Sequence, residues 1–199
     1  EKCKFIFVND GSKDGTSEIL TNKISKLFNN NKYKIINLNI NYGKAHAVKS
    51  GIEFIEGEYT ILIDSDLEYD PQDALEIYEI VKKNKIINII QGSRYLGAKV
   101  QSRKHIFNGI AVRINTFLFN FLFGQSITDL HTGTKIIKSN LLKKLNLTFP
   151  RFGLEIDMNA QIAKRDINIF EYGISYIERS KNDGKKITII DGFLAYFFL

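Results

Sequence analysis

The sequence predicts an α/β fold built on an open, mostly parallel sheet with helices on both faces. Short apolar runs alternate with longer segments of helical periodicity. Three of the runs are nearly continuous, which is typical of strands covered on both faces of a parallel sheet. The expected strands are Lys4–Val8, Tyr33–Asn39, Tyr59–Asp64 and Ile86–Gly92, and the helices between them are Thr16–Phe28, Lys44–Ile55 and Pro71–Lys83.

The pattern becomes less regular after Gly92. A basic stretch, Arg94–Lys104, is expected to be a loop. The later elements are a Phe-rich helix, a short strand, a second helix and a strand or hairpin, at Ile106–Phe123, Thr134–Lys138, Glu155–Lys164 and Ile167–Glu178. Because 199 residues suit one domain and no repeat or Pro/Gly linker interrupts them, residues 1–199 are expected to form a single domain.

The formal net charge of +6 is concentrated in two stretches. Arg94–Lys104 holds four basic and no acidic residues, and Arg179–Lys186 holds four basic residues and one acidic residue. These loops suit phosphates and an anionic membrane surface. Nucleic acid is not expected as a partner, because no recognised binding motif accompanies the charge. The single cysteine excludes an internal disulfide, and no apolar run reaches the ~18–20 residues that span a bilayer.

The strongest cluster of polar residues is Asp64–Glu68, directly after the predicted strand that begins at Tyr59. In open α/β sheets, ligands bind outside the carboxyl ends of the strands. If the chain stays extended here, Asp64 and Asp66 point to the same side. Two convergent carboxylates suit a hard divalent cation, Mg²⁺ or Mn²⁺. The alternative is a strand-end turn whose acidic side chains are solvated.

Two further turns join a strand to a helix. Gly11, in the turn from Asn9 to Thr16, allows close backbone approach, and Asp10 beside it could accept hydrogen bonds from a ribose or base. In the second turn, Lys44 could reach a phosphate. Taken singly, the first turn is also compatible with an ordinary β–α turn, and Lys44 is also compatible with a solvated lysine.

Taken together, the three turns resemble those of the family 2 glycosyltransferases, which have the Rossmann-like GT-A fold. The matching motifs are V-N-D-G-S-K-D-G-T at 8–16, N-Y-G-K-A-x-A at 41–47 and D-S-D-L-E-Y-D-P at 64–71. The second half is similar to the polyprenyl-phosphate sugar synthases, typified by dolichyl-phosphate mannose synthase. That similarity is carried by G-S-R at 92–94, D-L-H-T-G at 129–133 and R-S-K-N-D-G-K-K-I at 179–187.

The resemblance implies roles for particular residues. Those implied to bind metal are Asp64, Asp66 and Glu68, although relatives often carry Gln at the last position. Those implied to bind the nucleotide are Asp10, Gly11, Lys44 and Asp64. Those implied to be catalytic, through the metal, the donor diphosphate or the acceptor phosphate, are Asp66, Arg94 and Arg103. Those implied to bind the acceptor phosphate are Arg103, Arg179, Lys185 and Lys186, and Asp129 lies near the acceptor side.

The activity implied is an inverting, Mg²⁺- or Mn²⁺-dependent transfer of a sugar from a UDP- or GDP-sugar to dolichyl or undecaprenyl phosphate. The enzyme would act in glycan or cell-envelope biosynthesis, peripherally at the cytoplasmic face of the membrane. One alternative is transfer to a glycan hydroxyl, which needs a general base that Glu155 or Asp157 could supply. Both could equally be helix N-terminal acids. Another alternative is a non-catalytic module that binds a nucleotide sugar.

The chain also departs from the family pattern. Relatives open with a strand that ends in P-x-Y-N-E, and this chain does not contain that segment. We therefore expect the domain to lack its first strand here and to bind nucleotide weakly. Asn9 stands where many relatives have Asp. The Phe-rich helix Ile106–Phe123 is compatible with a membrane interface and equally with a core position.

Overall fold

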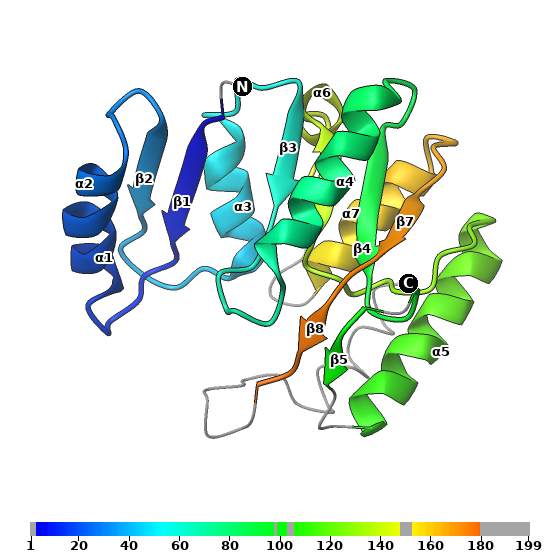
Figure 1. The fold of residues 1–199 in the computed structure, drawn as a ribbon. Helices are drawn as coiled ribbons and strands as arrows, with labels where there is room; N and C mark the ends of the chain where they lie inside the picture. Colours follow the sequence, from blue (N-terminus) through cyan, green and yellow to red (C-terminus); the bar gives the residue numbers. More distant parts are fainter. Residues whose placement is uncertain (1–2, 98, 103–105, 148–152, 180–199) are drawn as a thin grey trace. The chain divides into compact units, whose positions relative to one another are not determined.

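The computed structural model of the protein describes residues 3–97, 99–102, 106–147 and 153–179 (Figure 1). The chain forms two compact units. Unit 1 comprises Glu1–Thr60 and Ser139–Leu154, and unit 2 comprises Ile61–Lys138 and Glu155–Leu199. Each unit is described by itself below.

Unit 1 contains a two-stranded parallel sheet and its helices. Its elements are β1 (Phe5–Asn9), α1 (Thr16–Ile19), a π-helical segment η1 (Leu20–Ile24), α2 (Ser25–Leu27), β2 (Tyr33–Asn37), α3 (Lys44–Ile52) and α6 (Ser139–Leu142). In the register of the sheet, Phe5 lies opposite Tyr33 and Asn9 opposite Asn37. The helix expected at Thr16–Phe28 is therefore present, with a wider π turn in its middle.

Helix α3 packs on strand β1 at a glycine. A Cβ added at Gly51 would lie 3.4 Å from Val8 Cγ2 and 3.5 Å from Ile6 Cγ2, so a larger side chain would push the helix off the strand. Both strands are only half-buried, and Phe5 is 41% exposed. Their burial is thus less complete than is typical of strands covered on both faces.

Unit 2 holds the larger sheet, whose strand order is β3-β6-β4-β7. Its elements, including β3 at the boundary with unit 1, are β3 (Tyr59–Leu62), α4 (Pro71–Lys83), β4 (Ile89–Ser93), β5 (Gln101–Ser102), α5 (Ile106–Phe123), β6 (Lys135–Lys138), α7 (Leu154–Ala163), β7 (Phe170–Gly173) and β8 (Tyr176–Ile177). Strand β4 runs antiparallel to β6 and parallel to β7, and β5 pairs in parallel with β8.

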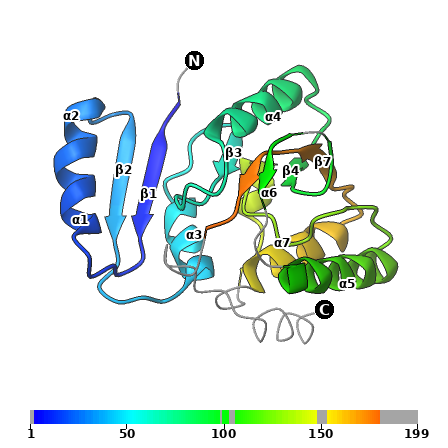
Figure 2. The same ribbon diagram turned by 60° about the horizontal axis from the view of Figure 1, so that its bottom comes forward.

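Helices cover both faces of the four-stranded sheet. Figure 2 shows α4 on one side of the sheet and α5 with α7 on the other. Strand β4 has a neighbour on each edge and all five of its residues are buried, as expected for a covered strand. Completely buried core side chains come from these layers and include Ile77, Ile89, Leu130, Ile136, Ile156 and Ile162. The expected α/β architecture, with a mostly parallel sheet and helices on both faces, is confirmed here.

The element boundaries differ from the sequence prediction in several places. Helices α4 and α5 have the predicted bounds. The segment expected at Ile167–Glu178 as a strand or hairpin forms two strands, β7 and β8, each parallel to a different partner, so it is not a hairpin. The predicted basic loop contains the short strand β5. Within the described residues, no helix combines the length and the apolar character needed to cross a membrane.

Truncating a buried and an exposed phenylalanine of α5 should have different effects on the free energy of unfolding. Phe119 is completely buried and its ring lies 4.9 Å from that of Phe123, whereas Phe121 is 78% exposed. We expect Phe119→Ala to lower the free energy of unfolding by about 3–5 kcal/mol, because it leaves a cavity. Phe121→Ala should change it by at most about 0.5 kcal/mol. Urea unfolding followed by circular dichroism measures both, and equal losses would contradict this packing.

Candidate active site

The turn after β1 is hydrogen-bonded to the turn before α3. Asp10 Oδ1 accepts a hydrogen bond from the Tyr42 backbone N–H at 2.9 Å, and Oδ2 accepts one from the Gly43 N–H at 2.7 Å. Gly11 has φ +67°, and a Cβ there would collide with the backbone of Ile40. The two turns that the sequence assigns to nucleotide binding therefore lie against each other, and the Asp10 carboxylate joins them through these two hydrogen bonds.

Neighbouring residues complete this pair of turns. The buried Asn9 donates from Nδ2 to Asn37 Oδ1 at 3.0 Å and accepts from the Ser12 N–H at 3.1 Å. Lys44 is the first residue of α3, directly after Gly43. Asp10, Gly11 and Lys44 thus come together in unit 1, whereas the fourth predicted nucleotide residue, Asp64, belongs to unit 2. Their nucleotide contacts stay predictions.

The acidic loop after β3 bends instead of continuing the strand. Residues 65–68 form a bend, and Leu67, which is 89% exposed, has φ +63°. That left-handed conformation is strained for a residue with a branched side chain. The expectation that an extended chain points Asp64 and Asp66 to the same side is therefore wrong, because the backbone turns within the motif.

Asp64 and Asp66 nevertheless remain electrostatic neighbours. The Asp64 carboxylate lies so close to the Cα of Gly133 that a Cβ at Gly133 would collide with Oδ2. Asp66 Oδ1 accepts from the Glu68 N–H at 3.2 Å, and Oδ2 accepts from Arg179 Nη2 at 3.0 Å. Burial, together with the Glu68 and Asp64 charges, raises the pKa of Asp66 above its ordinary value, although the Glu68 N–H and Arg179 oppose this.

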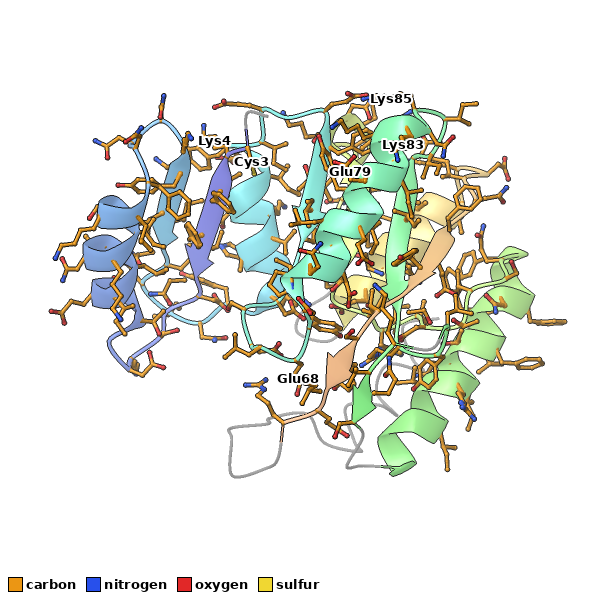
Figure 3. All side chains as sticks on the ribbon, in the orientation of Figure 1. Cys3, Lys4, Glu68, Glu79, Lys83 and Lys85 are labelled. Atoms are coloured by element: carbon orange, nitrogen blue, oxygen red, sulfur yellow. The ribbon has the colours of Figure 1, made fainter. Side chains whose placement is uncertain are left out.

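The Glu68 carboxylate is engaged by other parts of unit 2. Its side chain is buried, Oε2 accepts from the Tyr176 hydroxyl at 2.9 Å, and Oε1 accepts from the Arg179 N–H at 3.0 Å. Figure 3 labels Glu68 where the loop after β3 meets β8. Within the described residues, no three or more His, Cys, Asp or Glu side chains are arranged to hold a metal. The predicted set of three ligands is therefore not assembled among these residues, and metal binding by Asp64 and Asp66 stays a prediction.

Arg94 forms a buried ion pair with Asp129. Its Nε and Nη2 donate to the two carboxylate oxygens at 2.7 Å each, and its backbone N–H donates to Oδ2 at 3.0 Å. Burial opposes ionisation of Asp129, but the Arg94 charge and hydrogen bonds outweigh it and lower the pKa of this carboxyl. The guanidinium also lies 5.1 Å from the centre of the Tyr176 ring. The described structure thus pairs Arg94 with a carboxylate of the protein, and its expected contact with a diphosphate stays a prediction.

The described cations of the two basic stretches are paired with carboxylates. Lys99 donates to Asp73 Oδ1 at 2.5 Å and also pairs with Glu76. Arg179 binds Asp66 and Glu68, as Arg94 binds Asp129. These residues are therefore not the exposed cationic loops that the sequence suggests. The other predicted phosphate contacts, Arg103, Lys185 and Lys186, lie outside the described residues.

The two candidate bases lie in the first turn of α7. Glu155 and Asp157 are 8% and 5% exposed, and Gln161 donates to Asp157 Oδ1 at 2.7 Å. Glu155 acts electrostatically on His131, where burial nonetheless lowers the pKa of the imidazole. This position agrees with the alternative that both are helix N-terminal acids, and a role as general base stays a prediction.

Several residues of the network were not singled out from the sequence. Glu171 on β7 accepts from the N–H of Thr128 at 2.6 Å and from that of Asp129 at 3.0 Å, so it fixes the segment that carries Asp129. Gln91 donates to Glu171 Oε1 at 3.1 Å. Tyr69 accepts from the Gly133 N–H at 3.2 Å, and burial raises the pKa of Tyr69 to about 12. The sequence does contain a signal for Gln91 and Glu171, because each is a polar residue within a segment predicted to be a strand.

Removing the charge of Asp129 should destabilise unit 2 strongly. Asp129→Asn leaves the Arg94 cation buried without its partner, so we expect a loss of about 3–5 kcal/mol in the free energy of unfolding. The double variant Arg94→Met with Asp129→Leu should recover part of that loss, because neither charge remains. Chemical unfolding of the single and double variants measures the difference. A single variant as stable as the wild type would contradict the pairing.

The same pair predicts a pH dependence of stability. The folded-state pKa of Asp129 is below that of the unfolded chain, which is about 3.9. The contribution is therefore complete above about pH 4 and falls as the pH drops toward the folded-state pKa. Unfolding free energies measured from pH 7 to pH 3 should decline more steeply in the wild type than in Asp129→Asn. Parallel profiles would contradict the assignment.

Comparison with known proteins places these motifs in a family. The model of "Glycosyl transferase family 2" matches residues 1–145. The chain is 26% identical over 197 residues to a dolichyl-phosphate beta-glucosyltransferase of Dictyostelium discoideum, covering 92% of this chain and 57% of that protein. It is 23% identical to glycosyltransferase AglJ of Haloferax volcanii, covering 98% and 61%. The chain thus spans less than two thirds of the length of these relatives.

Solved structures show the same fold. Glucosyl-3-phosphoglycerate synthase of Mycobacterium tuberculosis, crystallised with Mn²⁺, UDP-glucose and phosphoglyceric acid, superposes with a TM-score of 0.68 at 15% identity. The match covers 97% of this chain and 66% of that one. It supports the expected GT-A fold. Since the family model matches well over half of its length, the chain belongs to glycosyl transferase family 2.

Proposed function

We propose that the protein transfers a hexose from a nucleoside diphosphate sugar to a polyprenyl phosphate, with inversion at the anomeric carbon and with Mg²⁺ or Mn²⁺. The observation that carries the proposal is the acidic loop of a family 2 glycosyltransferase, where the Asp64 and Asp66 charges interact and Arg179 binds Asp66. The dolichyl-phosphate relative supports a lipid phosphate as the acceptor.

The chemistry of Asp64 and Asp66 fits a divalent cation. Asp66 is partly buried beside two other carboxylates, and a cation between Asp64 and Asp66 would relieve their repulsion. Two carboxylate ligands suit Mg²⁺ or Mn²⁺, because such ions usually keep positions for water and substrate phosphates. When bound, the ion would neutralise charge on the diphosphate leaving group. Glu68 would act indirectly, since its carboxylate holds Tyr176 and Arg179.

A phosphate acceptor requires positioning more than deprotonation. A phosphate monoester has its second pKa near about 6 and is largely ionised at pH 7. Its oxygen would bond to the anomeric carbon as the bond to the diphosphate breaks, and the nucleoside diphosphate would leave with the electron pair. Arg179 is the described cation beside the acidic loop, with its side chain 34% exposed. Arg103, Lys185 and Lys186 are proposed to hold the acceptor phosphate with it.

The relatives favour a uridine nucleotide and glucose within the class of UDP- and GDP-sugars. The relatives include a beta-glucosyltransferase, and the structural neighbour was crystallised with UDP-glucose. In this proposal Asp10, Gly11, Lys44 and Asp64 contact the nucleotide. A lipid acceptor also implies a peripheral position at the cytoplasmic membrane face.

Transfer to a glycan hydroxyl is the second candidate. A poly-beta-1,6-N-acetyl-D-glucosamine synthase of Staphylococcus epidermidis is 33% identical over 90 residues, covering 45% of this chain and 21% of that protein. Such a reaction needs a base, and Glu155 or Asp157 would have to supply it. Both are nearly buried in the first turn of α7, which favours the phosphate acceptor.

The domain organisation remains part of the proposal. We propose that residues 1–199 belong to one GT-A domain. In the described sheet of unit 1, β1 pairs with β2 alone, which leaves its other edge available for a further strand.

The proposed reaction predicts selectivity for a phosphorylated lipid. With UDP-glucose and Mn²⁺, dolichyl or undecaprenyl phosphate should yield a glycosylated lipid phosphate, whereas dolichol and glycan acceptors should not. The physical reason is that the proposed acceptor contacts, Arg103, Arg179, Lys185 and Lys186, are cations suited to an ionised phosphate, whereas the candidate bases Glu155 and Asp157 are buried. Thin-layer chromatography with mass spectrometry identifies the product. Glycosylated dolichol or an elongated glycan would instead support the second candidate.

The metal assignment predicts different outcomes for two aspartates of one loop. Asp66→Asn should lower the rate at saturating Mn²⁺ by at least about 100-fold and weaken Mn²⁺ binding, because a charged ligand is lost. Asp70→Asn is the matched control, since Asp70 Oδ1 accepts from the Gln72 N–H at 2.8 Å and caps α4. It should retain activity. Calorimetric titration with Mn²⁺ accompanies the assay, and unchanged binding by Asp66→Asn would refute the assignment.

A further inference from the structure

The outward face of α5 carries a narrow apolar stripe. Ile110, Ile114, Phe117 and Phe121 follow at spacings of four, three and four residues, which places them within an arc of about 60° on the helix. These side chains are 49%, 52%, 70% and 78% exposed. Figures 1 and 2 both show α5 on the outside of unit 2. The stripe is therefore an apolar surface rather than part of the core.

The opposite face of α5 is held by polar contacts. Thr116 Oγ1 accepts from the Leu130 N–H at 3.2 Å. Asn120 donates to the Ile127 carbonyl at 2.7 Å and accepts from the Ile127 N–H at 3.1 Å. Phe119 is the completely buried apolar residue on this side. The inner face of α5 thus combines a buried phenylalanine with polar contacts, whereas the outward face carries the apolar stripe.

The one charge on α5 is cationic. Helix α5 contains no Asp or Glu, and its one charged residue, Arg113, is exposed at the side of the stripe. Its guanidinium lies 5.3 Å from the centre of the Tyr95 ring. An arginine stem can lie along apolar surface while its charge reaches polar headgroups. This arrangement complements a lipid surface that presents negative headgroups over an apolar interior.

We propose that α5 docks on an anionic membrane surface, with Ile110, Ile114, Phe117 and Phe121 entering the interface and Arg113 at the headgroups. The proposal extends the proposed function, since it names the surface from which a lipid-linked acceptor would be reached. A second copy of the chain fits the stripe less well. A stable protein interface takes about 20–30 residues from each side, and the stripe offers four.

Vesicle co-sedimentation tests this surface directly. The protein should bind vesicles of 70% phosphatidylcholine and 30% phosphatidylglycerol, and the double variant Phe117→Gln with Phe121→Gln should bind at least about tenfold more weakly. The matched control, Leu75→Gln with Ile86→Gln, removes two side chains that are 53% and 91% exposed elsewhere in unit 2 and should bind like the wild type. Arg113→Gln should reduce binding about fivefold on these vesicles and much less on pure phosphatidylcholine.

Three results would overturn the proposal. One is equal binding by the wild type and the Phe117/Phe121 variant, including no binding by either. Another is a wild-type dimer in sedimentation velocity that the variant dissociates, which would assign the stripe to a second copy. The last is a large fall in melting temperature of the variant, which would show that the stripe packs within the chain. Because the vesicles contain no polyprenyl phosphate or nucleotide sugar, failure of this test and failure of the transfer assay are distinguishable.

Discussion

The buried ion pair between Arg94 and Asp129 is the interaction on which the site in unit 2 depends. It joins the end of β4 to the segment that leads to Gly133, whose missing side chain leaves room for the Asp64 carboxylate. Glu171 holds that segment from β7. Because a buried charge without a partner is costly, the pair holds the end of β4 against the segment that carries Asp129. The position of the acidic loop therefore follows from the packing of the sheet.

A second constraint is the balance of charge around Asp66. Its carboxylate lies beside Glu68 and Asp64, and Arg179 offsets part of the resulting repulsion. A cation at this place would be favoured by the same excess of negative charge. The described basic residues thus act first within the protein, as partners of carboxylates. A role toward substrate phosphates is compatible with this for Arg179, whose side chain is one-third exposed.

The sequence predicts the alternation of strands and helices well, because apolar periodicity is local. Pro71 after the capping Asp70 even defines the start of α4. The sequence predicts poorly which side chains pair with each other in the folded chain. The pairing of Arg94 with Asp129 joins residues far apart in the chain, and the left-handed Leu67 breaks the extended geometry assumed for the acidic motif. The exposure of Phe117 and Phe121 likewise depends on which face of α5 finds polar partners, which periodicity alone does not decide.

The central claim is a single displacement at the anomeric carbon by a lipid phosphate oxygen. The most direct measurement is proton and phosphorus NMR of the product formed from UDP-glucose and a polyprenyl phosphate. The proposed displacement should give a phosphodiester linkage with the β configuration, inverted from the α-linked donor. A product with the α configuration, or a sugar joined to a hydroxyl oxygen, would contradict it.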